Sequence, residues 1–107
     1  MGISHRLAMK YFYCKLHAPR ANFAQTITPA EGQLLAQHGA YLRGFAEKRW
    51  AVAFGPVADP AGAFGVGLWE VPDEVDVAGL LATDPVIKAG QGFRYELPPM
   101  PSLVTRA

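Results

Sequence analysis

The sequence has 107 residues, of which ten are Lys or Arg and nine are Asp or Glu, so its formal net charge is +1. A chain of this length predicts one domain and leaves little room for a second. The near-neutral charge and the lack of any basic run argue against nucleic acid as a partner. No apolar stretch is long enough to span a bilayer, so we expect no membrane partner.

The N-terminal residues show no signal-peptide core, and the single cysteine, Cys14, excludes an internal disulfide. Both features predict a soluble cytoplasmic protein. Residues 1–8 fit no element, and Met9 is therefore a candidate for the native start. We expect a single domain over residues 9–100, with flexible tails at 1–8 and 101–107.

The first half of the chain begins with an aromatic strand over residues 9–17. Its alternation places Tyr11 and Tyr13 on one face and Phe12 and Cys14 on the other. After a loop, Thr28-Pro29-Ala30-Glu31 forms a predicted capping box. The following helix should run from residue 29 to about residue 48. The expected solvent face of that helix carries small and polar residues, namely Gln33, Ala36, Ala40, Arg43 and Glu47.

The second half of the chain reads as a hairpin, a short helical region and a final strand. We expect strands over residues 50–57 and 63–71, the first of them broken by Gly55-Pro56, with a turn at 59–62. A helix should cover residues 74–82. Asp84-Pro85 then resembles an N-cap followed by proline at the first position of a helical turn. The predicted last strand covers residues 93–97, and an extended proline-rich tail follows it.

The predicted order is β-α-β-β-α-β, which indicates an α+β protein of the ferredoxin-like class. In this arrangement two helices cover one face of a four-stranded antiparallel sheet. The other face is left bare, and a bare apolar face is usually buried by a second copy of the chain. We therefore expect a homodimer in which two sheets meet.

His38 is the main candidate for a functional residue, because it lies in the middle of the apolar stripe of the long helix. One interpretation is a core histidine that hydrogen-bonds a backbone carbonyl. The other is a general base, because histidine titrates near neutral pH. Such a base needs a carboxylate on its other ring nitrogen to hold the tautomer.

Asp84 is the candidate for that carboxylate, although an N-cap alone would account for it. Three aromatic residues, Tyr11, Tyr13 and Trp69, are candidates for a substrate-binding wall or for a hydroxyl group. No pair of histidines has the spacing of metal ligands, and one cysteine cannot build a zinc site, so we expect no metal and no cofactor.

Three stretches, LLAQHGAYLRGF, AVAFGPV and TDPVIKAGQGFRYELPPM, resemble in order and spacing those of the YciI-like (YCII-related) proteins. The resemblance covers about residues 10–99. It implies a dimeric α+β barrel with a ferredoxin-like protomer, and it implies that the family's histidine and aspartate correspond to His38 and Asp84. One branch of that family is similar to a cofactor-free dehydrochlorinase of chlorinated hydroxyquinols. The sequence departs from the family in having Gly39 after the histidine, and Trp50 stands at the start of the second strand.

Two functions follow as hypotheses. The first is a cofactor-independent enzyme in which His38 and Asp84 carry out proton transfer, coupled to elimination or isomerisation, on a small cyclic or aromatic compound. The second is a non-enzymatic domain that binds a small-molecule ligand or regulates another protein on the same dimeric scaffold, since fold alone does not decide function. An oxygenase of the antibiotic-biosynthesis type on the same barrel is disfavoured by the closing DPVIKAG segment.

Overall fold

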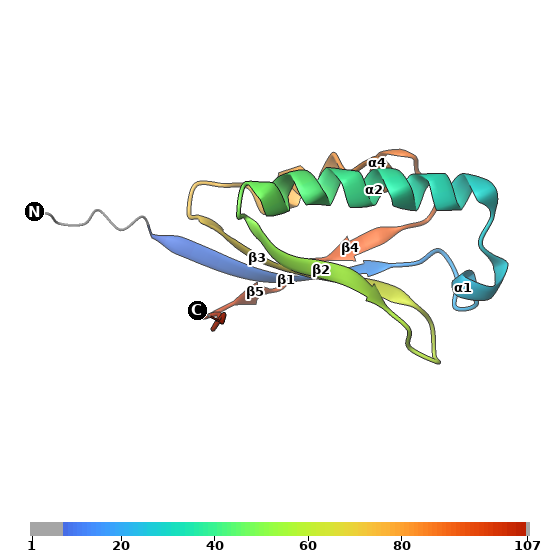
Figure 1. Ribbon diagram of the computed structural model, residues 1–107, viewed down its shortest axis with the longest axis horizontal. Coiled ribbons are helices and arrows are strands. Elements are labelled where there is room, and N and C mark those ends of the chain that lie inside the picture. Colours follow the sequence, from blue (N-terminus) through green and yellow to red (C-terminus); the bar gives the residue numbers. More distant parts are fainter. Residues whose placement is uncertain (1–7, 107) are drawn as a thin grey trace, which may run out of the picture.

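The computed structural model describes residues 8–106 as an antiparallel sheet with helices on one face (Figure 1). The predicted tail at 1–8 and the question of the native start lie almost wholly outside the described residues. The elements in chain order are β1 (Met9–His17), α1 (Phe23–Thr26), α2 (Pro29–Glu47), β2 (Ala51–Val57), β3 (Phe64–Pro72), α3 (Val77–Ala82), α4 (Pro85–Lys88), β4 (Arg94–Glu96) and β5 (Pro99–Met100).

The sheet has the strand order β2-β3-β1-β4, with every pair antiparallel. The long helix α2 and the short α4 lie above the same face in Figure 1. The expected α+β, ferredoxin-like protomer is therefore confirmed. No helix of residues 8–106 covers the other face of the sheet in that view.

The sheet has five strands, and the prediction of four is wrong. β5 pairs with β1 through Tyr11 opposite Met100 and Phe12 opposite Pro99. β4 pairs with the same edge of β1 closer to the C-terminal end of that strand. The chain after β4 thus continues beside β1, where the sequence indicated only an extended tail. Proline is tolerated here because an edge strand does not need every backbone N–H.

Three further boundaries differ from those expected from the sequence. A four-residue helix, α1, occupies part of the predicted loop, and its Phe23 packs edge-to-face on Phe93. α3 begins at Val77 rather than at residue 74, because the Asp76 side chain accepts a hydrogen bond from the Gly79 N–H and caps the helix there. β2 continues through Pro56, because β2 is the edge strand of the sheet.

The capping box of α2 is present, as predicted. The Thr28 hydroxyl accepts from the Glu31 N–H at 3.1 Å, and the Glu31 carboxylate accepts from the Thr28 N–H at 3.0 Å. Arg20 adds two 2.8 Å hydrogen bonds to the same carboxylate. This arrangement holds the start of α2 against the loop that follows β1. The residues of the predicted solvent face, Gln33, Ala36, Ala40, Arg43 and Glu47, are all exposed.

Two buried clusters hold α2 on the sheet. The larger cluster centres on Trp69 and Leu42, and the smaller on Phe23, Val86 and Phe93. Both clusters join helix residues to strand residues, and His38 lies on α2 between Leu35 and Leu42. The apolar stripe predicted for this helix therefore faces the sheet, and it brings the histidine there too.

Candidate functional site

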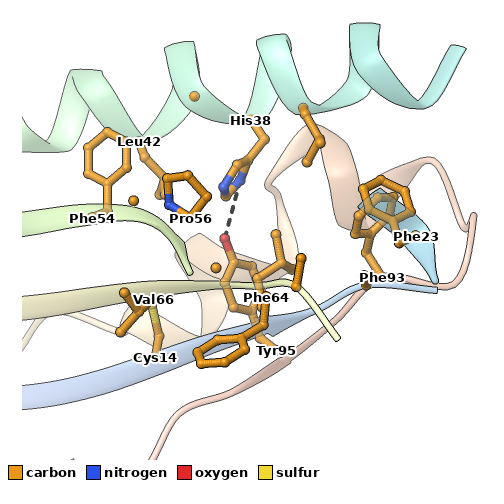
Figure 2. A pocket seen from close by; sticks show the side chains of 17 residues that line it. Cys14, Phe23, His38, Leu42, Phe54, Pro56, Phe64, Val66, Phe93 and Tyr95 are labelled. Carbon is orange, nitrogen blue, oxygen red and sulfur yellow. Dashed lines mark hydrogen bonds between the residues drawn. The ribbon is translucent and has the colours of Figure 1, made fainter. Parts of the chain in front are cut away.

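A cavity of about 360 Å³ lies between α2 and the sheet (Figure 2). Its lining is mostly apolar, with Leu35 and Leu42 from the helix and Leu16 and Phe54 from the strands. His38 points into it from α2 (Figure 2). This volume falls at the lower end of the range of about 300–1,000 Å³ that is typical of pockets for small molecules.

Asp84 is the most completely buried polar residue of the described chain, with 0% of its surface exposed. One carboxylate oxygen, Oδ1, accepts from the Val86 N–H at 3.0 Å and caps α4. The cap that the sequence indicated is therefore present. Because this cap occupies Oδ1, the second oxygen is free to bind other donors.

The second oxygen, Oδ2, contacts His38. The distance from His38 Nδ1 to Asp84 Oδ2 is 2.7 Å, although 46 positions separate the two residues in the chain. The structure thus brings the two predicted residues together, and Asp84 serves as both cap and partner. A carboxylate only accepts, so Nδ1 carries the hydrogen, and in the neutral imidazole the lone pair is on Nε2. We find no hydrogen bond to Nε2 from the described part of the chain.

Tyr95, on β4, is a third member of this cluster, which the sequence analysis did not single out. Its hydroxyl donates to Asp84 Oδ2 at 2.7 Å and lies 3.4 Å from His38 Nδ1, the contact drawn as a dashed line in Figure 2. Burial, together with the hydrogen bond to Asp84, raises the pKa of this hydroxyl far above its usual value. Tyr95 therefore stays a donor to the carboxylate. The only sequence signal for it was its place beside Phe93 and Leu97 on one face of the last strand.

Cys14 also lines the cavity, from β1. Its sulfur accepts a hydrogen bond from the Trp69 indole N–H at 3.4 Å. Burial raises the pKa of the thiol, and the protonated form is a poor nucleophile. The cysteine is thus suited to packing.

The aromatic residues proposed as a substrate-binding wall lie elsewhere. Tyr11 and Tyr13 alternate with Phe12 and Cys14 along β1, so their side chains face away from α2, and neither lines the cavity. Trp69 is on the correct face but is 1% exposed within the core and lies outside the cavity lining. Their prediction as wall residues of this cavity is therefore wrong, because both faces of β1 are aromatic and the alternation alone did not tell which one α2 covers. The aromatic part of the lining consists instead of Phe23, Phe54, Phe64, Phe93 and Tyr95.

The lining contains no lysine or arginine. Arg20, in the loop after β1, forms hydrogen bonds to Glu31 and Thr26. Among residues 8–106 there is also no group of three or more histidine, cysteine or acidic side chains that could hold a metal ion. No helix in that range has the length and apolar character needed to cross a membrane.

Comparison with known proteins gave one family. The model of the YCII-related domain matches residues 9–101. No curated protein and no solved structure matched the chain. The matched range includes the cavity and all three members of the His38–Asp84–Tyr95 cluster. The chain therefore belongs to the YCII-related family.

Proposed function

We propose that this protein is a cofactor-independent enzyme that transfers protons with His38 as general base and acid. The observation that carries the proposal is the 2.7 Å contact between His38 Nδ1 and a fully buried Asp84 carboxylate at the edge of a cavity. Asp84 holds the neutral imidazole in one tautomer and stabilises the imidazolium that forms when Nε2 takes a proton. Tyr95 donates to the same carboxylate oxygen and helps to keep the carboxylate in place.

The polar atoms around the cavity indicate the kind of substrate. Nε2 of His38 offers a lone pair, and the Tyr95 oxygen, whose hydrogen is given to Asp84, offers another. Both positions suit a substrate that donates an O–H or an acidic C–H. The apolar lining, without a cationic side chain, suits an uncharged ring, because an anion would lose its hydration without gaining a partner.

The proposed reaction is an elimination, such as dehydrochlorination, or an isomerisation. His38 Nε2 removes a proton from the substrate, and the freed electron pair forms a new double bond. In elimination the leaving group departs with its bonding pair, whereas in isomerisation the imidazolium returns the proton to a different atom. Isomerisation thereby regenerates the neutral His38, whereas after elimination the imidazolium gives its proton to water before the next cycle.

A pair of matched variants tests the catalytic role. Chloride release from a panel of chlorinated hydroxyquinols is measured with wild type, His38→Gln and His17→Gln. Loss of the base should lower the rate by roughly 10²–10⁴-fold. His17, which lies on the other face of β1 and contacts Glu96 at 3.0 Å, provides the control and should keep its activity. Turnover by His38→Gln at the wild-type rate would remove the assignment.

A second function, binding of a small ligand without chemistry, is favoured by one feature of the cluster. Asp84 already receives hydrogen bonds from Val86, Tyr95 and His38 in the free protein, which is also the arrangement of a purely structural network. A ligand that binds in the cavity, yet shows neither chloride release nor exchange of its acidic hydrogens with deuterated water, would establish this second function.

The homodimer is part of the same proposal. The sheet face away from α2 carries Tyr11 and Tyr13, which are half-buried in the single chain and would be covered by a second sheet. Light scattering on the purified protein should give twice the 11.6 kDa mass of the chain. A monomeric mass at micromolar concentration would contradict it. The cytoplasmic location stays a prediction from the sequence.

A further inference from the structure

Helix α2 presents a gap to the cavity beside His38. Leu35, His38, Gly39 and Leu42 line the cavity, and this spacing places them on one helix face. Three of the four fill space with a side chain. A Cβ atom added to Gly39 would meet nothing within 4 Å. The open volume therefore reaches the helix backbone at this position.

Gly55, on β2, also lines the cavity, and a Cβ there would likewise meet nothing within 4 Å. Two glycines of β3 behave differently. On β3, a Cβ at Gly67 would come within 2.9 Å of the Cys14 sulfur, and one at Gly65 within 3.3 Å of Leu16 Cβ. Packing between neighbouring strands explains why these two positions lack a side chain. No such contact explains Gly39, where glycine also destabilises a helix interior relative to alanine.

Two other glycines of α2 show that free space alone is not the distinguishing feature. A Cβ at Gly32 or at Gly44 would also meet nothing within 4 Å, but neither residue lines the cavity. Gly44 is exposed on the surface of the helix. Gly39 is the only one of the three whose missing side chain enlarges the cavity, and the enlargement lies next to the proposed base.

We propose that Gly39 determines substrate size by leaving room beside His38 for a ring system wider than one six-membered ring. The inference rests on the proposed function only in taking this cavity as the ligand site. The occupant is an uncharged, flat molecule of two fused rings or of one ring with bulky substituents. Its O–H or N–H points at Nε2, and its far edge occupies the space over Gly39.

The test compares the binding of two uncharged probes, phenol and 2-naphthol, by titration calorimetry. Gly39→Leu places a good helix former at the gap, and Gly44→Leu makes the same change on the exposed face of the same helix. We expect Gly39→Leu to weaken 2-naphthol binding by roughly tenfold or more, with at most about a threefold change for phenol, because the added side chain overfills the space. Gly44→Leu should change neither affinity.

Gly39→Ala is the second variant, in case leucine disturbs the fold. It adds one carbon where nothing lies within 4 Å, so it should have a higher Tm than wild type. It should still weaken the binding of 2-naphthol more than the binding of phenol. Affinity for 2-naphthol within about threefold of wild type in both Gly39 variants would overturn the proposal. If the wild-type protein bound neither probe, both the role of Gly39 and the assignment of this cavity as the ligand site would be overturned. Size-dependent binding without any turnover would support the role of Gly39 and contradict only the enzyme.

Discussion

The contact between His38 and Asp84 is best perturbed by Asp84→Asn. The amide oxygen can keep the 3.0 Å hydrogen bond from the Val86 N–H, so the cap of α4 survives. The amide NH₂ then replaces Oδ2 and faces two donors, His38 Nδ1–H and the Tyr95 hydroxyl, which both lie 2.7 Å from that atom. His38 can avoid the clash only by moving its hydrogen to Nε2, which removes the lone pair from the cavity.

The expected cost of this change follows from the two hydrogen bonds that are lost. Mismatched buried partners cost about 1–3 kcal/mol, so we expect about 2 kcal/mol for Asp84→Asn. For a domain near 100 residues this corresponds to a fall in Tm of roughly 8–16 °C. Thermal unfolding followed by circular dichroism measures the fall, and ¹⁵N NMR of the imidazole reports which ring nitrogen carries the hydrogen.

Asp76→Asn is the matched control. Asp76 caps α3 through the Gly79 N–H at 3.0 Å, and it is exposed, with no other side-chain partner in the described chain. Asparagine caps helices about as well as aspartate, so this variant should keep the wild-type Tm. The reasoning fails if the Tm of Asp84→Asn falls no further than that of Asp76→Asn and Nδ1 of His38 still carries the hydrogen. Oδ2 would then not hold the imidazole.

Three more predictions concern single side chains. Tyr95→Phe removes the hydroxyl that donates to Asp84 at 2.7 Å and should lower the free energy of unfolding in urea by about 1 kcal/mol, whereas a gain in stability would show that this hydrogen bond contributes nothing. The pKa of Glu31 is held at about 2, below its ordinary 4.5, chiefly by hydrogen bonds from Arg20. The stability that this carboxylate contributes is therefore complete above pH 4.5 and is lost as the pH falls towards 2. In Glu31→Gln, the free energy of unfolding should consequently fall less steeply over this pH range than in wild type. Glu47→Gln, as the control, should follow the wild-type pH dependence. Cys14 is 2% exposed and its thiol has a raised pKa, so iodoacetamide should label it only in denaturant, as measured by the intact mass of the protein. Equally fast labelling of the folded protein would contradict this burial.

The sequence by itself determined the features that depend on neighbouring residues. The capping box at Thr28 and the cap at Asp84 are encoded within three or four positions, and both were predicted correctly. The face of α2 that carries His38 follows from the 3.6-residue period. The order of strands and helices follows from where each pattern starts and stops, and that order was enough to predict the ferredoxin-like class.

Local patterns were least reliable where a distant segment decides the outcome. β5 exists because β1 leaves an edge beside it, and β2 runs through Pro56 because no strand of residues 8–106 pairs on its outer side. The alternation placed Tyr11 and Tyr13 on one face of β1 but did not tell which face α2 covers, since both faces carry aromatic residues.

Only the tertiary structure decided which side chains form the candidate site. His38 and Asp84 are 46 positions apart, and nothing in the spacing between them requires contact. Tyr95 joins them because β4 pairs with β1 below α2, and the gap at Gly39 becomes a cavity only because strands lie opposite it. Helix and strand periods determine which way a residue faces within its own element, whereas the packing of elements against one another determines what that residue meets.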